Sequence, residues 1–235
     1  MSNFNIDIYY DGSDNIEQYL DCVDGVTTNI GFLKKSKIVD YNKFIRETLA
    51  LNKDKKPISF QVFGASKTAC RKQAEKINFI ADECGSPVFT KIPIVSPSGE
   101  NFTPLIHQLV FTNQFSINTT CIYTKDQIDE LAFLSQAKSP TIVSIFCGRI
   151  GDTGHNPLDI VDYAVSRFRD NDNVKILWAG CQRVYDVQVA EKSGCDIITV
   201  PEGVLKKMDR LGTSLHDFSV KTSYDFHMDG QGLEL

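Results

Sequence analysis

Lys91 is the residue whose type and place in the sequence most favour covalent chemistry. It lies in the run 89–94, which is typical of a β-strand. Pro93 cannot donate a strand hydrogen bond, so Lys91 should stand near the carboxyl end of that strand. Desolvation there favours the neutral amine, which can attack a ketone and form a Schiff base, an electron sink for breaking a carbon–carbon bond. The alternative is a lysine that points outward between helices, but Thr90 and Ile92 suit that side better.

Polar residues recur on one side of several other predicted strands. Side chains alternate between the two faces of a strand, and in the first strand the apolar parity of Ile6, Ile8 and Tyr10 leaves Asp11 on the opposite face. The same alternation turns a further set inward: Ser59, Gln61, Asn118, Thr120, Ser144 and Phe146. Burying an unpaired amide or hydroxyl costs about 1–3 kcal/mol, so this set indicates a site. Asp11 can move protons directly, whereas Gln61 and Thr120 can orient a water molecule.

A repeated alternation of short apolar runs and longer amphipathic stretches must position these residues. Eight strands are predicted, at residues 6–12, 25–29, 58–63, 88–94, 116–123, 141–148, 175–181 and 197–201. Such alternation implies parallel strands with right-handed crossovers, and closing the sheet removes its edges. We therefore expect one domain over residues 1–235, a (β/α)8 TIM barrel with its site at the carboxyl ends of the strands.

Several helices carry their own boundary signals. Thr124 and Gln127 form a capping box, and Ser66 begins a helix that Gly85 ends. The stretch 215–228 is predicted to be an amphipathic C-terminal helix. It either packs on its own barrel or contacts another subunit.

Composition excludes several classes of function. A formal net charge of −5 argues against a nucleic-acid partner. No apolar run approaches the length of a membrane span, and the first residues do not read as a signal peptide, so we expect a cytoplasmic protein. The seven cysteines form no Cys-x-x-Cys pair, and the four histidines show no metal-ligand spacing, so no metal and no cofactor are expected. His155 follows the sixth strand and either touches substrate or lies in an exposed loop.

In these motifs the chain resembles the transaldolase family, which includes the fructose 6-phosphate aldolases. Asp11 resembles the family's first-strand aspartate, and Lys91 in Thr-Lys-Ile-Pro resembles its Schiff-base lysine. The resemblance implies that further residues contact the sugar or its phosphate: Thr27 and Asn29 in Thr-Thr-Asn, Asn118 and Thr120 in Asn-Thr-Thr, and Ser144, Phe146 and Arg149 in Ser-Ile-Phe-Cys-Gly-Arg-Ile. In this reading Arg149 holds the phosphate.

Four positions differ from one or both branches of the family. Gln61 matches the small aldolases, whereas larger transaldolases have a glutamate there. Phe146 matches the transaldolases, whereas the small aldolases have a tyrosine whose hydroxyl assists protonation of the enamine. Gly180 and Gln182 replace the serine and arginine of the phosphate site, and Arg183 comes one position late, on the opposite face of a strand.

The resemblance implies an enzyme that transfers a dihydroxyacetone unit from a ketose or ketose phosphate, such as fructose 6-phosphate, to an aldose. Two alternatives remain: a lyase that releases free dihydroxyacetone, and a barrel that binds a sugar phosphate without turnover. The expected partners are sugars or sugar phosphates and other copies of the chain, with no nucleic acid and no membrane. The pathway is either the pentose phosphate pathway or one that makes surface polysaccharide.

Overall fold

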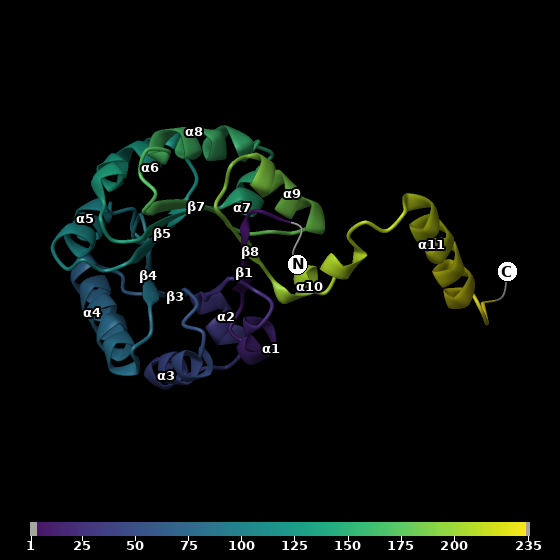
Figure 1. Ribbon diagram of the computed structural model, residues 1–235, viewed down its shortest axis with the longest axis horizontal. Helices are drawn as coiled ribbons and strands as arrows, with labels where there is room; N and C mark the ends of the chain where they lie inside the picture. The colour runs from purple at the N-terminus through teal and green to yellow at the C-terminus, as the bar shows by residue number, and fades with distance from the viewer. Residues whose placement is uncertain (1–3, 234–235) are drawn as a thin grey trace.

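The strands close into a parallel barrel in which each strand pairs with its neighbours in sequence order and the last pairs with the first (Figure 1). The computed structural model describes residues 4–233. The strands are β1 (Asp7–Asp11), β2 (Gly25–Thr27), β3 (Ile58–Gln61), β4 (Val88–Pro93), β5 (Ile117–Ile122), β6 (Thr141–Ile145), β7 (Val174–Trp178) and β8 (Ile197–Val200). This arrangement confirms the predicted (β/α)8 barrel, with every strand inside or within one residue of its predicted range.

Helices surround the barrel and cover its outer face (Figure 1). The helices of residues 4–233, including α11, which lies apart from the barrel, are α1 (Ile16–Leu20), α2 (Ile30–Lys35), α3 (Tyr41–Leu51), α4 (Lys67–Cys84), α5 (Thr103–Phe111), α6 (Lys125–Glu130), α7 (Cys147–Asp152), α8 (Leu158–Phe168), α9 (Val184–Lys192), α10 (Glu202–Leu205) and α11 (Leu215–Asp229), with 3-10 turns at Ala132–Gln136 and Met208–Arg210. The predicted boundary signals are confirmed. Thr124 and Gln127 form the capping box of α6, Ser66 caps α4, and Gly85 ends α4 in the left-handed region.

The sixth strand is shorter than predicted because the chain turns into a helix at its carboxyl end. β6 ends at Ile145 and α7 begins at Cys147, within the range predicted to be strand. The reason is tertiary: the Gly148 N–H donates to the carbonyl of Ala179, and a Cβ on Gly148 would lie 2.1 Å from the carbonyl oxygen of Gly180. The two loops after β6 and β7 thus meet backbone to backbone.

Two apolar clusters divide the interior. The larger lies between the barrel and its helices and contains Ile6, Ile8 and Tyr10, the parity predicted to face outward. The smaller combines residues of the opposite parity: Tyr9, Ile142, Leu177, Ala179 and Ile197, with Phe89 and Phe146 packed against them. On several strands the polar axial residue comes two positions after an apolar one, as Lys91 follows Phe89. The smaller cluster therefore forms an apolar floor beneath a polar mouth.

The C-terminal helix α11 stands away from the barrel that precedes it (Figure 1). None of its residues is buried, and Leu215 and Phe226 are 87% and 72% exposed. Packing on its own barrel, one of the two predicted alternatives, is therefore wrong. Among residues 4–233, no helix has both the length and the apolar character needed to cross a membrane.

Candidate active site

Lys91 lies inside the barrel near the carboxyl end of β4 and is only 5% exposed. The barrel register sets it beside Gln61 of β3 on one side and Asn118 of β5 on the other. Burial disfavours the charged ammonium and lowers the pKa of Lys91 below its ordinary value. The amine is thus held in a place that increases its neutral, nucleophilic fraction.

Asp11, at the end of β1, is the carboxyl group whose negative charge raises the pKa of Lys91 against the effect of burial. Burial raises the pKa of Asp11, while the charge of Lys91 and a hydrogen bond from the Thr27 hydroxyl oppose that rise. The Thr27 Oγ1 lies 2.9 Å from the carboxylate oxygen and donates to it. An acid with a raised pKa beside an amine with a lowered one can exchange protons with groups on a bound substrate.

Asn29 lies just beyond Thr27, where the chain leaves β2 and enters α2. Its side-chain oxygen caps that helix by accepting from the Phe32 N–H at 3.1 Å. A ligand at this position would therefore meet the amide nitrogen of Asn29. The Thr27 and Asn29 motif serves the local fold as well as the mouth.

Three buried polar side chains on β3, β5 and β6 form a continuous hydrogen-bond chain. The Ser144 hydroxyl donates to the Asn118 side-chain oxygen at 2.7 Å, and the Asn118 amide donates to the Ser59 hydroxyl at 3.0 Å. These two hydrogen bonds fix the orientation of the Asn118 amide, with its oxygen toward Ser144 and its nitrogen toward Ser59. Sequence reasoning turned Ser59 inward but gave it no role, and its partner became visible only in the barrel register.

Thr120 and Gln61 complete the polar wall of the mouth. The Thr120 hydroxyl is buried and has no hydrogen-bond partner within residues 4–233. Such a group is stable only if a water molecule or a ligand satisfies it. Gln61 is half-buried, and its backbone carbonyl accepts a 3.0 Å hydrogen bond from the Tyr41 hydroxyl, which fixes the end of β3.

Cys121 is a residue of the mouth that sequence reasoning did not single out. The pairing of β5 with β6 is irregular between Thr119 and Ile122, and Cys121 has a φ of 62°. Burial raises the pKa of the Cys121 thiol, and the charges of Lys91 and Arg149 both oppose that rise. The thiol thus lies within electrostatic reach of both cations. No sequence pattern marks this bulge.

An aromatic and cationic stack forms one rim. The Phe146 ring stacks on Tyr123 with centroids 5.6 Å apart, and the Arg149 guanidinium lies 5.5 Å from the Phe146 centroid. Arg149 is exposed on α7, and no ion pair involves it in the part of the chain that the structure describes. Its charge is therefore available to a ligand at the mouth.

The rim after β7 carries an amide where the resemblance leads us to look for a cation. The Gln182 side-chain amide donates to the Asp152 carboxylate at 3.2 Å. Arg183 instead binds the carboxylate of Asp186 at 3.0 Å at the start of α9. The Asp186 carboxylate caps α9 by accepting from the backbone N–H groups of Gln182 and Arg183, and the Arg183 guanidinium pairs with that carboxylate.

His155 and Gln127 lie outside the axial site. His155 is exposed, and its Nδ1 lies 2.9 Å from the Thr153 hydroxyl oxygen. It lines a side cavity of about 380 Å³ together with Tyr123 and Lys125. The Gln127 side chain accepts from the Tyr123 N–H and so holds the loop after β5.

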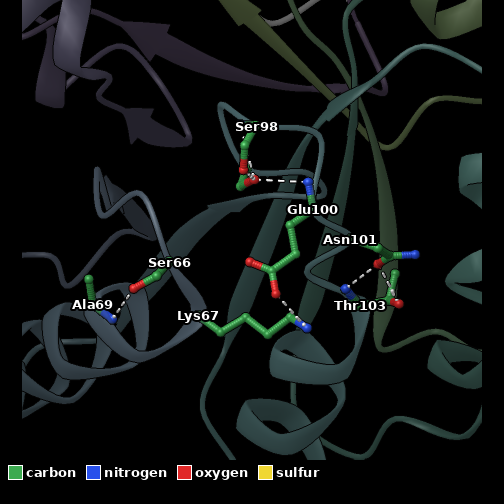
Figure 2. Close-up of polar contacts among 8 residues, drawn as sticks. Ser66, Lys67, Ala69, Ser98, Glu100, Asn101 and Thr103 are labelled. Carbon is green, nitrogen blue, oxygen red and sulfur yellow. Dashed lines mark hydrogen bonds and ion pairs between the residues drawn. The ribbon is translucent and has the colours of Figure 1, made fainter.

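The loop after β4 is tied to the loop after β3 by polar contacts (Figure 2). Lys67, the first residue of α4, pairs with Glu100 at 3.0 Å. Asn101 accepts from the Thr103 N–H at 2.7 Å and leads the chain into α5. These contacts hold the ends of the two strands that carry Gln61 and Lys91. Across residues 4–233 no group of three or more histidine, cysteine or acidic residues could hold a metal ion.

Comparison with known proteins gives a consistent family and a broader fold. The chain is similar to a probable transaldolase of Methanococcus vannielii, 27% identical over 89% of this chain and 91% of that protein. It is also similar to one of Thermoplasma acidophilum, 28% identical over 79% of this chain and 78% of that protein. Among solved structures, dihydrodipicolinate synthase of Thermotoga maritima has a TM-score of 0.59 at 14% identity, covering 97% of this chain and 81% of that one, which shows the barrel fold alone. The model of the Transaldolase/Fructose-6-phosphate aldolase family matches residues 10–230, and the chain belongs to that family.

Proposed function

We propose that this protein is a class I transaldolase that moves a dihydroxyacetone unit from a ketose to an aldose through a Schiff base on Lys91. The observation that carries the proposal is the pairing of a buried amine of lowered pKa with the Asp11 carboxyl group in the polar mouth of the barrel. Membership of the transaldolase and fructose 6-phosphate aldolase family supports it.

The reaction begins when the neutral Lys91 amine attacks the ketose carbonyl at C2. The carbinolamine takes up a proton at its hydroxyl and loses water, giving an iminium ion. Asp11 supplies this proton and is left as the carboxylate, and Gln61 and Thr120 hold the water molecule between carboxyl and substrate. The unpartnered Thr120 hydroxyl gives that water a hydrogen-bond partner.

The carbon–carbon bond then breaks next to the iminium ion. Asp11 takes the C4 hydroxyl proton, the C3–C4 electron pair forms the C2=C3 bond of an enamine as the iminium pair moves to nitrogen, and the C4 aldehyde of the released aldose departs. The enamine that stays on Lys91 attacks the carbonyl carbon of a second aldose, whose oxygen takes the proton back from Asp11, and water hydrolyses the new Schiff base. Thr27, Asn29, Asn118 and Ser144 hydrogen-bond the donor unit, while Phe146 and Arg149 contact its distal end.

Borohydride reduction tests this step directly. Incubation with fructose 6-phosphate and borohydride should leave a stable adduct on the peptide that contains Lys91, as measured by peptide mass. A Lys91→Met variant should yield none. Ligand-dependent thermal stabilisation with no adduct in the unsubstituted protein would instead favour a barrel that binds sugar without turnover.

A lyase that releases free dihydroxyacetone is the second candidate, and Gln61 favours it. Phe146 opposes it, because the ring has no hydroxyl with which to protonate the enamine. Measuring free dihydroxyacetone with and without an aldose acceptor separates the two. Formation of a new ketose with the acceptor, and little free dihydroxyacetone without it, favours transfer. Rapid release of free dihydroxyacetone without an acceptor favours the lyase.

We also propose that the chain assembles into a homo-oligomer through α11. A 15-residue helix with no buried residue is not stable in water on propensity alone. Its exposed Phe218 and Phe226 would be buried against another copy of the chain. The assembly thus supplies the packing that the single chain lacks.

A further inference from the structure

The rim around Arg149 is built for an uncharged distal group. We propose that the sugar substrates of this protein end in a free hydroxyl and not in a phosphate, with Asp152 and Gln182 as the residues that set this preference. The inference rests on the proposed function, because it concerns the far end of the sugar whose carbonyl Lys91 attacks.

The charge on this rim disfavours a phosphate. A phosphate dianion is ordinarily bound by several cationic or N–H donors, with bidentate arginines prominent. Within residues 4–233, Arg149 lies beside the Phe146 ring with no ion-pair partner, whereas Arg183 pairs with Asp186. Asp152 follows Arg149 by three residues on α7, so the two side chains lie on one helix face. A carboxylate at that position repels a dianion held by Arg149.

Asp152 is hydrogen-bonded to a neutral partner. Its carboxylate accepts from the neutral Gln182 amide at 3.2 Å, so its negative charge is not cancelled by a cation there. A carboxylate and an amide together provide acceptors and donors for hydroxyl groups. The Phe146 and Tyr123 rings beside them offer apolar faces to the carbons of a sugar. A hydrogen-bond donor, an acceptor and an apolar ring face together suit the hydroxyl-bearing carbons of an unphosphorylated sugar.

The loops after β6 and β7 leave no room for a side chain where Gly148 and Gly180 meet. Gly180 has a φ of 81°, a conformation in which any side chain is strained. Its carbonyl oxygen lies against Gly148, where even a Cβ would approach to 2.1 Å. The Gly148 N–H at the start of α7 is itself bonded to the Ala179 carbonyl. These two glycines therefore supply no side-chain donor for an anion.

Adduct formation on Lys91 is compared for three ketoses, two that differ only in the group at the end far from the carbonyl and one that has no such end. Fructose and fructose 6-phosphate report on the distal group, and dihydroxyacetone, which has no distal group, reports on Lys91 alone. At equal limiting concentrations, the initial rate of borohydride trapping with fructose should equal or exceed that with fructose 6-phosphate. Gln182→Arg should raise the ratio of the trapping rate with fructose 6-phosphate to the trapping rate with fructose by about tenfold. The new guanidinium adds a charge-assisted contact to the phosphate and neutralises Asp152.

Two further variants control for charge. Asp152→Asn should raise the same ratio by about threefold, through loss of an exposed repulsion. Asp170→Asn makes the same change in net charge after α8, at the amino end of β7, and should leave the ratio unchanged.

The outcomes separate the two proposals. No adduct with any of the three donors removes the proposed function and this inference with it. An adduct with dihydroxyacetone but with neither hexose overturns the inference alone. So does a strong preference for fructose 6-phosphate in the unsubstituted protein, or a ratio that Gln182→Arg leaves unchanged.

Discussion

Asp11 and Lys91 each oppose the change that burial makes in the pKa of the other. Burial lowers the pKa of Lys91 and the Asp11 charge raises it, while burial raises the pKa of Asp11 and the Lys91 charge lowers it. In both groups burial is the larger influence. The pair therefore stays closer to neutral than two exposed groups of the same types would, and each member can exchange a proton.

The ionisation of Lys91 should respond to Asp11 in a defined direction. Competitive acylation followed by peptide mass analysis should place the pKa of Lys91 below its ordinary 10.5. Asp11→Asn removes the negative charge that favours the ammonium, so the pKa should fall further. An unchanged or higher value in that variant would show that the carboxylate does not act on the amine.

Lys91 should make the free energy of unfolding depend on pH. Because its pKa is lower in the folded state, the unfolded chain binds more protons between that lowered value and 10.5. The free energy of unfolding should therefore rise with pH between these two pKa values. The buried ammonium should destabilise the fold fully at pH values below this range and not at all above it. Denaturant unfolding of Lys91→Met over the same pH range should show a smaller rise. An identical pH dependence in both proteins would contradict the buried ammonium.

The hydrogen-bond chain through Asn118 should contribute measurably to stability. Ser144→Ala leaves the buried Asn118 side-chain oxygen without its 2.7 Å donor. The free energy of unfolding should fall by about 1–3 kcal/mol, as measured by denaturant titration. Ser139→Ala removes an exposed hydroxyl bonded to a backbone carbonyl and should change stability by less than about 0.5 kcal/mol. Equal changes in the free energy of unfolding for the two substitutions would argue against a stabilising role for the buried hydrogen bonds of Asn118.

Two glycines of α7 should respond oppositely to alanine. Gly148→Ala forces a Cβ against the Gly180 backbone and should lower stability by about 1–3 kcal/mol. Gly151→Ala, in the same helix, meets open space and should raise stability by about 0.5–1 kcal/mol. Thermal unfolding of both variants measures the difference. A tolerated Gly148→Ala would mean that the loops after β6 and β7 are free to separate.

The exposed aromatic residues of α11 should hold subunits together. Light scattering of the unsubstituted protein should give a mass above that of one chain, and Phe226→Glu should lower it, because a carboxylate cannot be buried in an apolar contact. Lys221→Gln changes the net charge by the same amount on this helix and should leave the mass unchanged. A protein that is already a single chain in solution would remove the proposed role of α11.

The repeated strand and helix pattern determined the barrel, and strand alternation turned most of the axial residues inward. Apolar parity in β1 separates Tyr9 and Asp11 from Ile8 and Tyr10, and the two apolar clusters divide along that parity. Pro93 likewise located the carboxyl end of β4. These features depend only on residues close together in the chain and on the alternation of side chains along a strand, so they can be identified from one sequence.

Contacts between distant segments decided the rest. β6 ends where it does because Gly148 approaches Gly180, and the position of Cys121 follows from a bulge in β5. Arg183 is directed to Asp186 by their ion pair. The sequence also left open where α11 packs. Each of these depends on two segments that meet only once the barrel has closed, and the free energy of such a contact leaves no periodic pattern in either segment.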